Sequence, residues 1–147
     1  MKKDINMGRM TRQSHFLNDV LKEANQNKRQ QKLRYANADQ INAVSELVMN
    51  TLRGSVKPGR KTVSRLKPYR QSLRVIANPR QSIKKRKHLM STQIGAGAWK
   101  ELHRCYHCAK RQYILLLNPL FKKLRRVLKK NLTKHQKELL KGLKKEL

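Results

Sequence analysis

Apolar residues recur at three- and four-residue spacing along most of this chain, a period typical of amphipathic α-helices. The clearest case begins near Asp39, a plausible N-cap, and ends before Gly54, a residue type common just past a helix C-terminus. The apolar positions between them are Ile41, Val44, Leu47, Val48 and Leu52. No segment of comparable length alternates with the two-residue period of a half-buried strand. The pattern therefore predicts an all-α protein.

Further helices are expected on both sides of this one. Ser14 can begin a helix that carries Phe16, Leu17, Val20, Leu21 and Ala24 on one face, before the polar run 25–32. A third helix fits residues 64–77, because Pro68 is tolerated in a first turn, and its apolar face holds Leu66, Tyr69, Leu73 and Ile76. Ser82 can cap a fourth, strongly basic helix that continues to about Met90.

The run Gly95-Ala-Gly97 interrupts the pattern and divides the chain. Beyond it, Trp99, Leu102, Tyr106 and Ala109 predict a short helix, and Pro119 opens a long basic, leucine-rich helix. We therefore expect a polar N-terminal helix or tail over 1–36, a basic helical domain over 37–94 and a third part over 98–147. High net charge with modest hydrophobicity predicts that the basic extensions are partly disordered.

Charge narrows the choice of partner. The chain has 37 Lys+Arg against 8 Asp+Glu, a formal net charge of +29, and no acidic residue from Leu47 to Lys100. Solvated helix faces normally mix both signs, so this bias favours a polyanion, with double-stranded DNA preferred. Lys and Arg bind phosphates without reading the base sequence. The candidate nucleic-acid-binding residues are Arg53, Lys57, Arg60, Lys61, Arg65, Lys67, Arg70, Arg74, Arg80, Lys84, Lys85, Arg86 and Lys87.

Other functions remain open at this point. A ribosomal or ribonucleoprotein component would share the charge balance, and the cluster Lys84–Lys87 could equally be read by a nuclear importer. Catalysis has little support, because no paired carboxylates, phosphate-cradling glycine loop or nucleophile elbow occurs. We predict a non-enzymatic protein with no catalytic residue.

Four residues at close spacing could bind a metal ion. They are His103, Cys105, His107 and Cys108. A closed zinc site needs four ligands, commonly from two separated pairs, and thiol redox chemistry is another use of a Cys-x-x-Cys pair. Buried cysteines with exposed histidines are favoured over both, so no cofactor is predicted.

The leucine-rich tail over 120–147 is basic and amphipathic. Such helices pair with other helices, fill protein grooves, coat nucleic acid or lie on anionic membranes. A packing seam is favoured over a membrane as the partner of this face, and a membrane-active or helix-pairing module is the alternative function of the tail. The longest apolar run, Tyr113-Ile-Leu-Leu-Leu117, is too short to span a bilayer. Because the first residues lack the apolar stretch of a secretory signal, an intracellular location is expected.

Residues 39–97 resemble a small basic protein of Polinton/Maverick elements and adintoviruses. Three motifs match in order: Leu52-Arg-Gly54, then Leu66-Lys-Pro-Tyr-Arg-Gln-Ser-Leu-Arg-Val-Ile-Ala77, then Ser82-Ile-Lys-Lys-Arg-Lys87. That family is similar to the precursor of adenovirus core protein X, which condenses DNA. The resemblance implies a virion core or minor capsid protein, located in the virion and host nucleus, with capsid proteins as possible partners.

The same resemblance implies a processing site. The related proteins carry Gly-Gly before an apolar tail, which resembles an adenovirus-type protease site. The corresponding residues here are Ile94, Gly95, Ala96 and Gly97, which lack the double glycine. The Cys/His helix and the basic leucine-rich helix replace the apolar tail, so the resemblance implies nothing for the C-terminal third.

Overall fold

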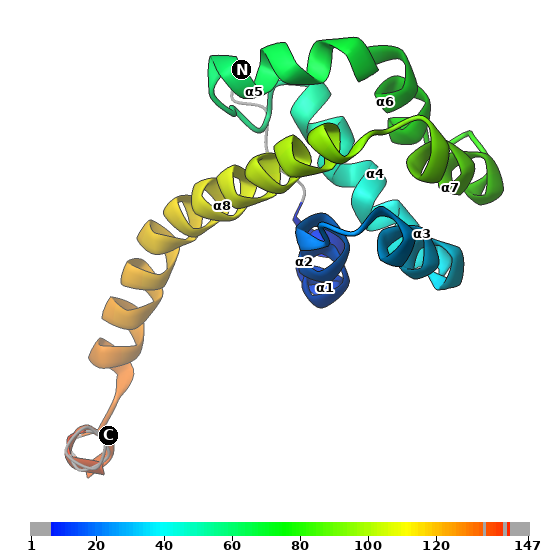
Figure 1. The fold of residues 1–147 in the computed structure, drawn as a ribbon. Helices are drawn as coiled ribbons and strands as arrows, with labels where there is room; N and C mark the ends of the chain where they lie inside the picture. The colour runs from blue at the N-terminus through cyan, green and yellow to red at the C-terminus, as the bar shows by residue number, and fades with distance from the viewer. Residues whose placement is uncertain (1–6, 134, 140, 142–147) are drawn as a thin grey trace. The chain divides into compact units, whose positions relative to one another are not determined.

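Every regular element in the described residues, 7–133, 135–139 and 141 of this computed structural model, is helical, which confirms the all-α prediction (Figure 1). Contacts divide the chain into two units, one up to Gln112 and one from Tyr113. The elements are α1 (Gly8–Arg12), α2 (Ser14–Lys22), α3 (Gln26–Tyr35), α4 (Ala38–Leu52), α5 (Arg60–Leu66), the 3-10 helix η1 (Lys67–Tyr69), α6 (Arg70–Ala77), α7 (Ile83–Thr92) and α8 (Ala96–Asn131).

Helix α4 is the centre of the first unit and packs against α1, α2, α6 and α7 (Figure 1). Its apolar face is buried as predicted, although Leu52 in the last turn is 40% exposed. The N-cap is Asn37, not Asp39, because Asn37 and Gln40 exchange hydrogen bonds in a capping box. At the other end, Gly54 adopts a φ of 73°, the left-handed conformation expected of a glycine after a helix.

Residues 7–36 are mostly helical and contribute buried side chains to the core. Helices α1 and α2 pack on α4, and α3 packs on α7. Leu17, Val20 and Leu21 are buried as the spacing predicts, whereas Ala24 lies beyond the end of α2 and is exposed. The polar run after it forms α3, whose N-cap Asn25 accepts a hydrogen bond from the Lys28 backbone.

The predicted helix over 64–77 is two helices. The first begins earlier, at Arg60, and η1 separates it from α6 around Pro68. Proline cannot donate the backbone hydrogen bond of a helix interior, and the tighter 3-10 turn accommodates it. Ser82 caps α7 as predicted, because its Oγ accepts a hydrogen bond from the Lys85 backbone N–H at 3.2 Å.

Helix α8 runs without interruption through both predicted breaks, Gly97 and Pro119. Its first turns complete the core of the first unit, where Trp99, Leu102 and Tyr106 are fully buried. The division between units falls after Gln112, later than the boundary expected near Gly97. Within the described residues, no helix combines the length and the apolar character that a membrane crossing requires.

Candidate nucleic-acid interface

Most of the candidate cations lie on four consecutive helices, α5, η1, α6 and α7 (green in Figure 1). Each of these helices contacts the next one along the chain. Each of the α-helices α5, α6 and α7 has at least one apolar residue in the core, although Val63 of α5 is 47% exposed. In α6, Leu73 and Ile76 are buried, whereas Arg70 and Arg74, one turn apart, are exposed. The local amphipathic pattern therefore fixes the outward position of the basic residues, because the apolar ones must face the core.

Eleven of the thirteen candidate residues are exposed, and we refer to them as the basic surface. Lys87 is half-buried, and its Nζ donates a hydrogen bond to the Arg34 carbonyl at 3.2 Å. Arg86 is buried. The basic surface consists of Arg53, Lys57, Arg60, Lys61, Arg65, Lys67, Arg70, Arg74, Arg80, Lys84 and Lys85.

The prediction that Arg86 is a surface residue for phosphate binding is corrected by the structure, because Arg86 is only 3% exposed. One guanidinium nitrogen donates to Asn42 Oδ1 and to Ser45 Oγ, both at 2.8 Å, and its Nε donates to the Gln81 carbonyl at 3.2 Å. Burial lowers the pKa of Arg86, and the positive charge of Arg9 lowers it further. The residue ties α7 to α4 and presents no surface to a phosphate.

The acidic residues of the first unit are already engaged in ion pairs. Each of the five that the structure describes up to Gln112 contacts a basic side chain. Their ion pairs involve one residue of the basic surface, Arg65. The pairs are Asp39 and Glu46 with Arg9, Asp19 and Glu23 with Lys32, and Glu101 with Arg65 and Arg104.

Glu101 is the one buried carboxylate of this group, at 2% exposed. Its Oε1 lies 3.0 Å from both Arg65 Nη1 and Arg104 Nη1. Burial alone would raise the pKa of Glu101, but hydrogen bonds from Arg65 and Thr62 and the charge of Arg104 outweigh it and lower that pKa. Glu101 thus joins α8 to α5 as a stable anion beneath the basic surface.

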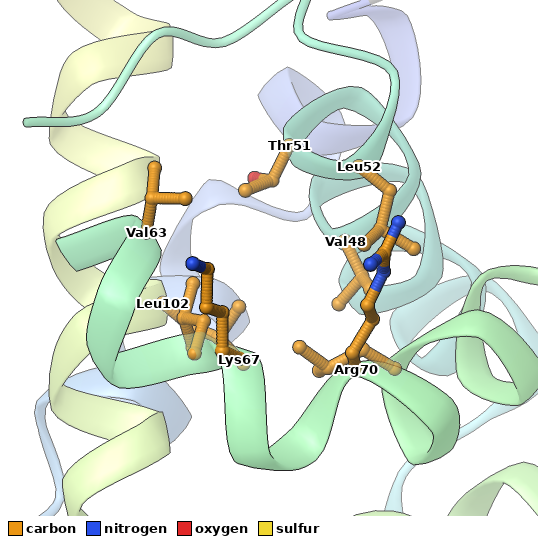
Figure 2. A pocket seen from close by; sticks show the side chains of 9 residues that line it. Val48, Thr51, Leu52, Val63, Lys67, Arg70 and Leu102 are labelled. Carbon is orange, nitrogen blue, oxygen red and sulfur yellow. The ribbon is translucent and has the colours of Figure 1, made fainter. Parts of the chain in front are cut away.

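A pocket of about 320 Å³ opens beside this surface. Its walls are mostly apolar, and the side chains of Lys67 and Arg70 extend along two sides of it (Figure 2). The sequence pattern does not reveal this pocket, because its residues come from five separate elements. They are Val48, Thr51 and Leu52 of α4, Val63 and Leu66 of α5, Lys67 of η1, Arg70 and Leu73 of α6, and Leu102 of α8.

The Cys/His cluster does not assemble into a metal centre. Within the described residues, no three His, Cys, Asp or Glu side chains lie close enough to hold a metal ion. His103 Nε2 and His107 Nε2 lie 3.0 Å apart, and Cys105 is buried in the core. Burial raises the pKa of the Cys105 thiol to about 11, which suppresses the thiolate that redox chemistry requires.

The predicted processing site lies at the start of α8. Ile94 is buried, the Gly95 carbonyl accepts hydrogen bonds from the backbones of Ala98 and Trp99, and Gly97 is helical. Cleavage at this site requires the first turn of α8 to open. It would also cut the covalent link between the helices before it and the part of α8 that carries the buried Trp99.

Comparison of the chain with known protein families, curated proteins and solved structures finds no match.

Proposed function

We propose that this chain is a non-enzymatic protein that binds duplex DNA through its phosphates and compacts it. The observation that carries the proposal is the basic surface, with eleven exposed cations in a segment free of acidic residues. Among the described residues, the five carboxylates of the first unit form ion pairs with Arg65 and with three basic residues outside the basic surface, so they neutralise little of the charge of that surface. Each neutralised phosphate releases a condensed counterion, which drives association.

The amount of charge fits compaction better than recognition of one site. A net charge of +29 would neutralise about 15 base pairs at two phosphate charges per pair. A predominance of phosphate contacts gives affinity without base specificity. The resemblance to the small basic proteins of Polinton/Maverick elements and adintoviruses supports a place in a virion core or minor capsid layer, and hence in the virion and host nucleus.

The test measures the salt dependence of binding to a short duplex by electrophoretic mobility shift. The variant Lys57→Gln/Lys61→Gln removes two charges from the basic surface, and Lys22→Gln/Lys28→Gln removes two exposed charges from α2 and α3. We expect the first variant to reduce the slope of log K against log salt by about 2, and the second by less than about 1. Equal losses in the two variants would contradict a defined surface.

Structured RNA is the competitor that matters, because a ribonucleoprotein component would use the same phosphate chemistry. We expect the protein to bind duplex DNA at least as tightly as a folded RNA of equal charge. A strong preference for the RNA would overturn the DNA proposal. Light scattering with long duplex DNA tests compaction itself, which should appear near charge neutralisation.

A further inference from the structure

The part of α8 in the second unit, from Tyr113 to Asn131, has one apolar and one basic face. The apolar face consists of half-buried Leu117 and of seven side chains that are between 46% and 63% exposed, namely Ile114, Leu116, Leu120, Phe121, Leu124, Val127 and Leu128. At about 100° per residue these positions share one side of the helix. The opposite side, which we call the basic face, carries Lys122, Lys123, Arg125, Arg126, Lys129 and Lys130, all exposed.

The apolar face is too large to be incidental. Single exposed leucines are ordinary, whereas a contiguous exposed apolar stripe marks a surface that binds something. Pro119 does not interrupt the stripe, because helical spacing places it on the polar side. The stripe and its flanks contain no acidic residue from Tyr113 to Asn131.

Pairing with a second copy is disfavoured by the borders of the apolar face. Arg125 lies one turn from Phe121 and from Leu128 on one border, and Lys123 lies one turn from Leu120 and Val127 on the other. In a helix pair such flanking positions normally carry opposite charges that attract across the seam. Two copies of this helix would bring cations together with no acidic complement.

We propose that this segment of α8 binds an anionic lipid surface and lies parallel to it. The apolar face enters the boundary between headgroups and acyl chains, and the flanking Lys and Arg side chains extend their stems toward the lipid phosphates and carboxylates. Negative lipid supplies the charge that the helix lacks. A large apolar face of leucine and phenylalanine opposite a lysine- and arginine-rich face is the pattern of helices that lie in a membrane interface.

The sequence pattern favours a packing seam for this face. The exposure of the apolar face, together with cations on both of its borders, favours a lipid surface instead. Lipid binding by this segment is independent of DNA binding, which rests on the first unit. Lying on a surface is compatible with a helix that cannot cross a membrane.

The test is flotation of the full chain with vesicles of phosphatidylcholine, with and without phosphatidylserine, at physiological salt. Two leucine-to-aspartate variants form a matched pair. Leu124→Asp places a charge in the apolar face, whereas Leu115→Asp places the same charge on the basic side, where Leu115 is 68% exposed. We expect Leu124→Asp to weaken binding to phosphatidylserine vesicles about tenfold, and Leu115→Asp less than about threefold.

Several results would overturn the proposal. A chain with this net charge attracts anionic vesicles through charge alone, and equal binding of both variants would mean that nothing more than this attraction occurs. Equally strong binding to vesicles without phosphatidylserine would remove the role of the basic face. A dimer of the wild-type chain that Leu124→Asp dissociates, with no lipid binding, would assign the face to a second copy.

Discussion

Replacement of Arg86 tests whether this buried arginine has a structural role, in contrast to the exposed basic residues that we propose to bind phosphate. The side chain makes three hydrogen bonds at 2.8–3.2 Å, to Asn42, Ser45 and the Gln81 carbonyl. Arg86→Ala removes all three, leaves the buried Ser45 without this donor and vacates space between α7 and α4. Hydrogen bonds to a charged group contribute about 1.5–3 kcal/mol each, but the relief of a buried charge offsets part of this loss. We expect a net loss of about 3 kcal/mol in the free energy of unfolding.

Urea unfolding followed by circular dichroism at 222 nm measures that loss. A lowering of Tm by roughly 10 °C should accompany it for a unit of this size. The matched control is Lys85→Ala, an exposed neighbour whose replacement should change stability by less than about 0.5 kcal/mol. DNA binding should respond in the opposite order, with a smaller salt slope for Lys85→Ala and an unchanged slope for folded Arg86→Ala. A stable Arg86→Ala protein with a reduced salt slope would refute the reasoning.

Three further predictions concern the first unit. Gly54→Ala should lower stability by about 1 kcal/mol in urea unfolding because φ is 73°, whereas Gly59→Ala, with open space around it, should not. A thiol-specific reagent at pH 8 should label half-buried Cys108 first and Cys105 only after denaturation, because burial raises the pKa of Cys105 to about 11. The pKa of Glu101 is lowered on folding, so its stabilisation is complete above the unfolded value and disappears as pH falls. Glu101→Gln should therefore lower the urea midpoint at pH 7 and flatten its decline toward pH 3.

Much of the fold could be predicted from periodicity. The apolar face of α4 and the inward residues of the first part of α8 follow from spacing, and the cap at Ser82 follows from its residue type. The breaks were harder, because Gly97 and Pro119 are ordinary signals of helix ends. Tertiary packing overrides the signal at Gly97, where the following Trp99 is buried. At Pro119 one missing backbone donor is insufficient to end the helix.

The candidate interface, like the fold, could be predicted from the sequence only in part. A charge pattern predicts that cations face outward, and for eleven residues they do. The charge pattern does not predict that Arg86 is buried, because its cluster contains both exposed and buried positions. Which position is buried depends on hydrogen-bond partners in α4. Arg29 is another basic residue whose burial depends on its tertiary partners. It is buried from within a polar run, donates to the carbonyls of Val20 and Glu23, and stacks over the ring of Trp99.

That stack gives the chain an internal optical probe. Trp99 is the one tryptophan of the sequence, it is 1% exposed, and the guanidinium carbon of Arg29 lies 5.3 Å from its ring centroid. Its emission should therefore report the joining of α8 to α3 within the first unit, with a red shift when that contact opens. The basic amphipathic part of α8 lacks tryptophan, so ligand binding there should leave the emission of Trp99 unchanged. Trp99 emission can therefore follow unfolding of the core, while vesicle flotation follows binding to this part of α8.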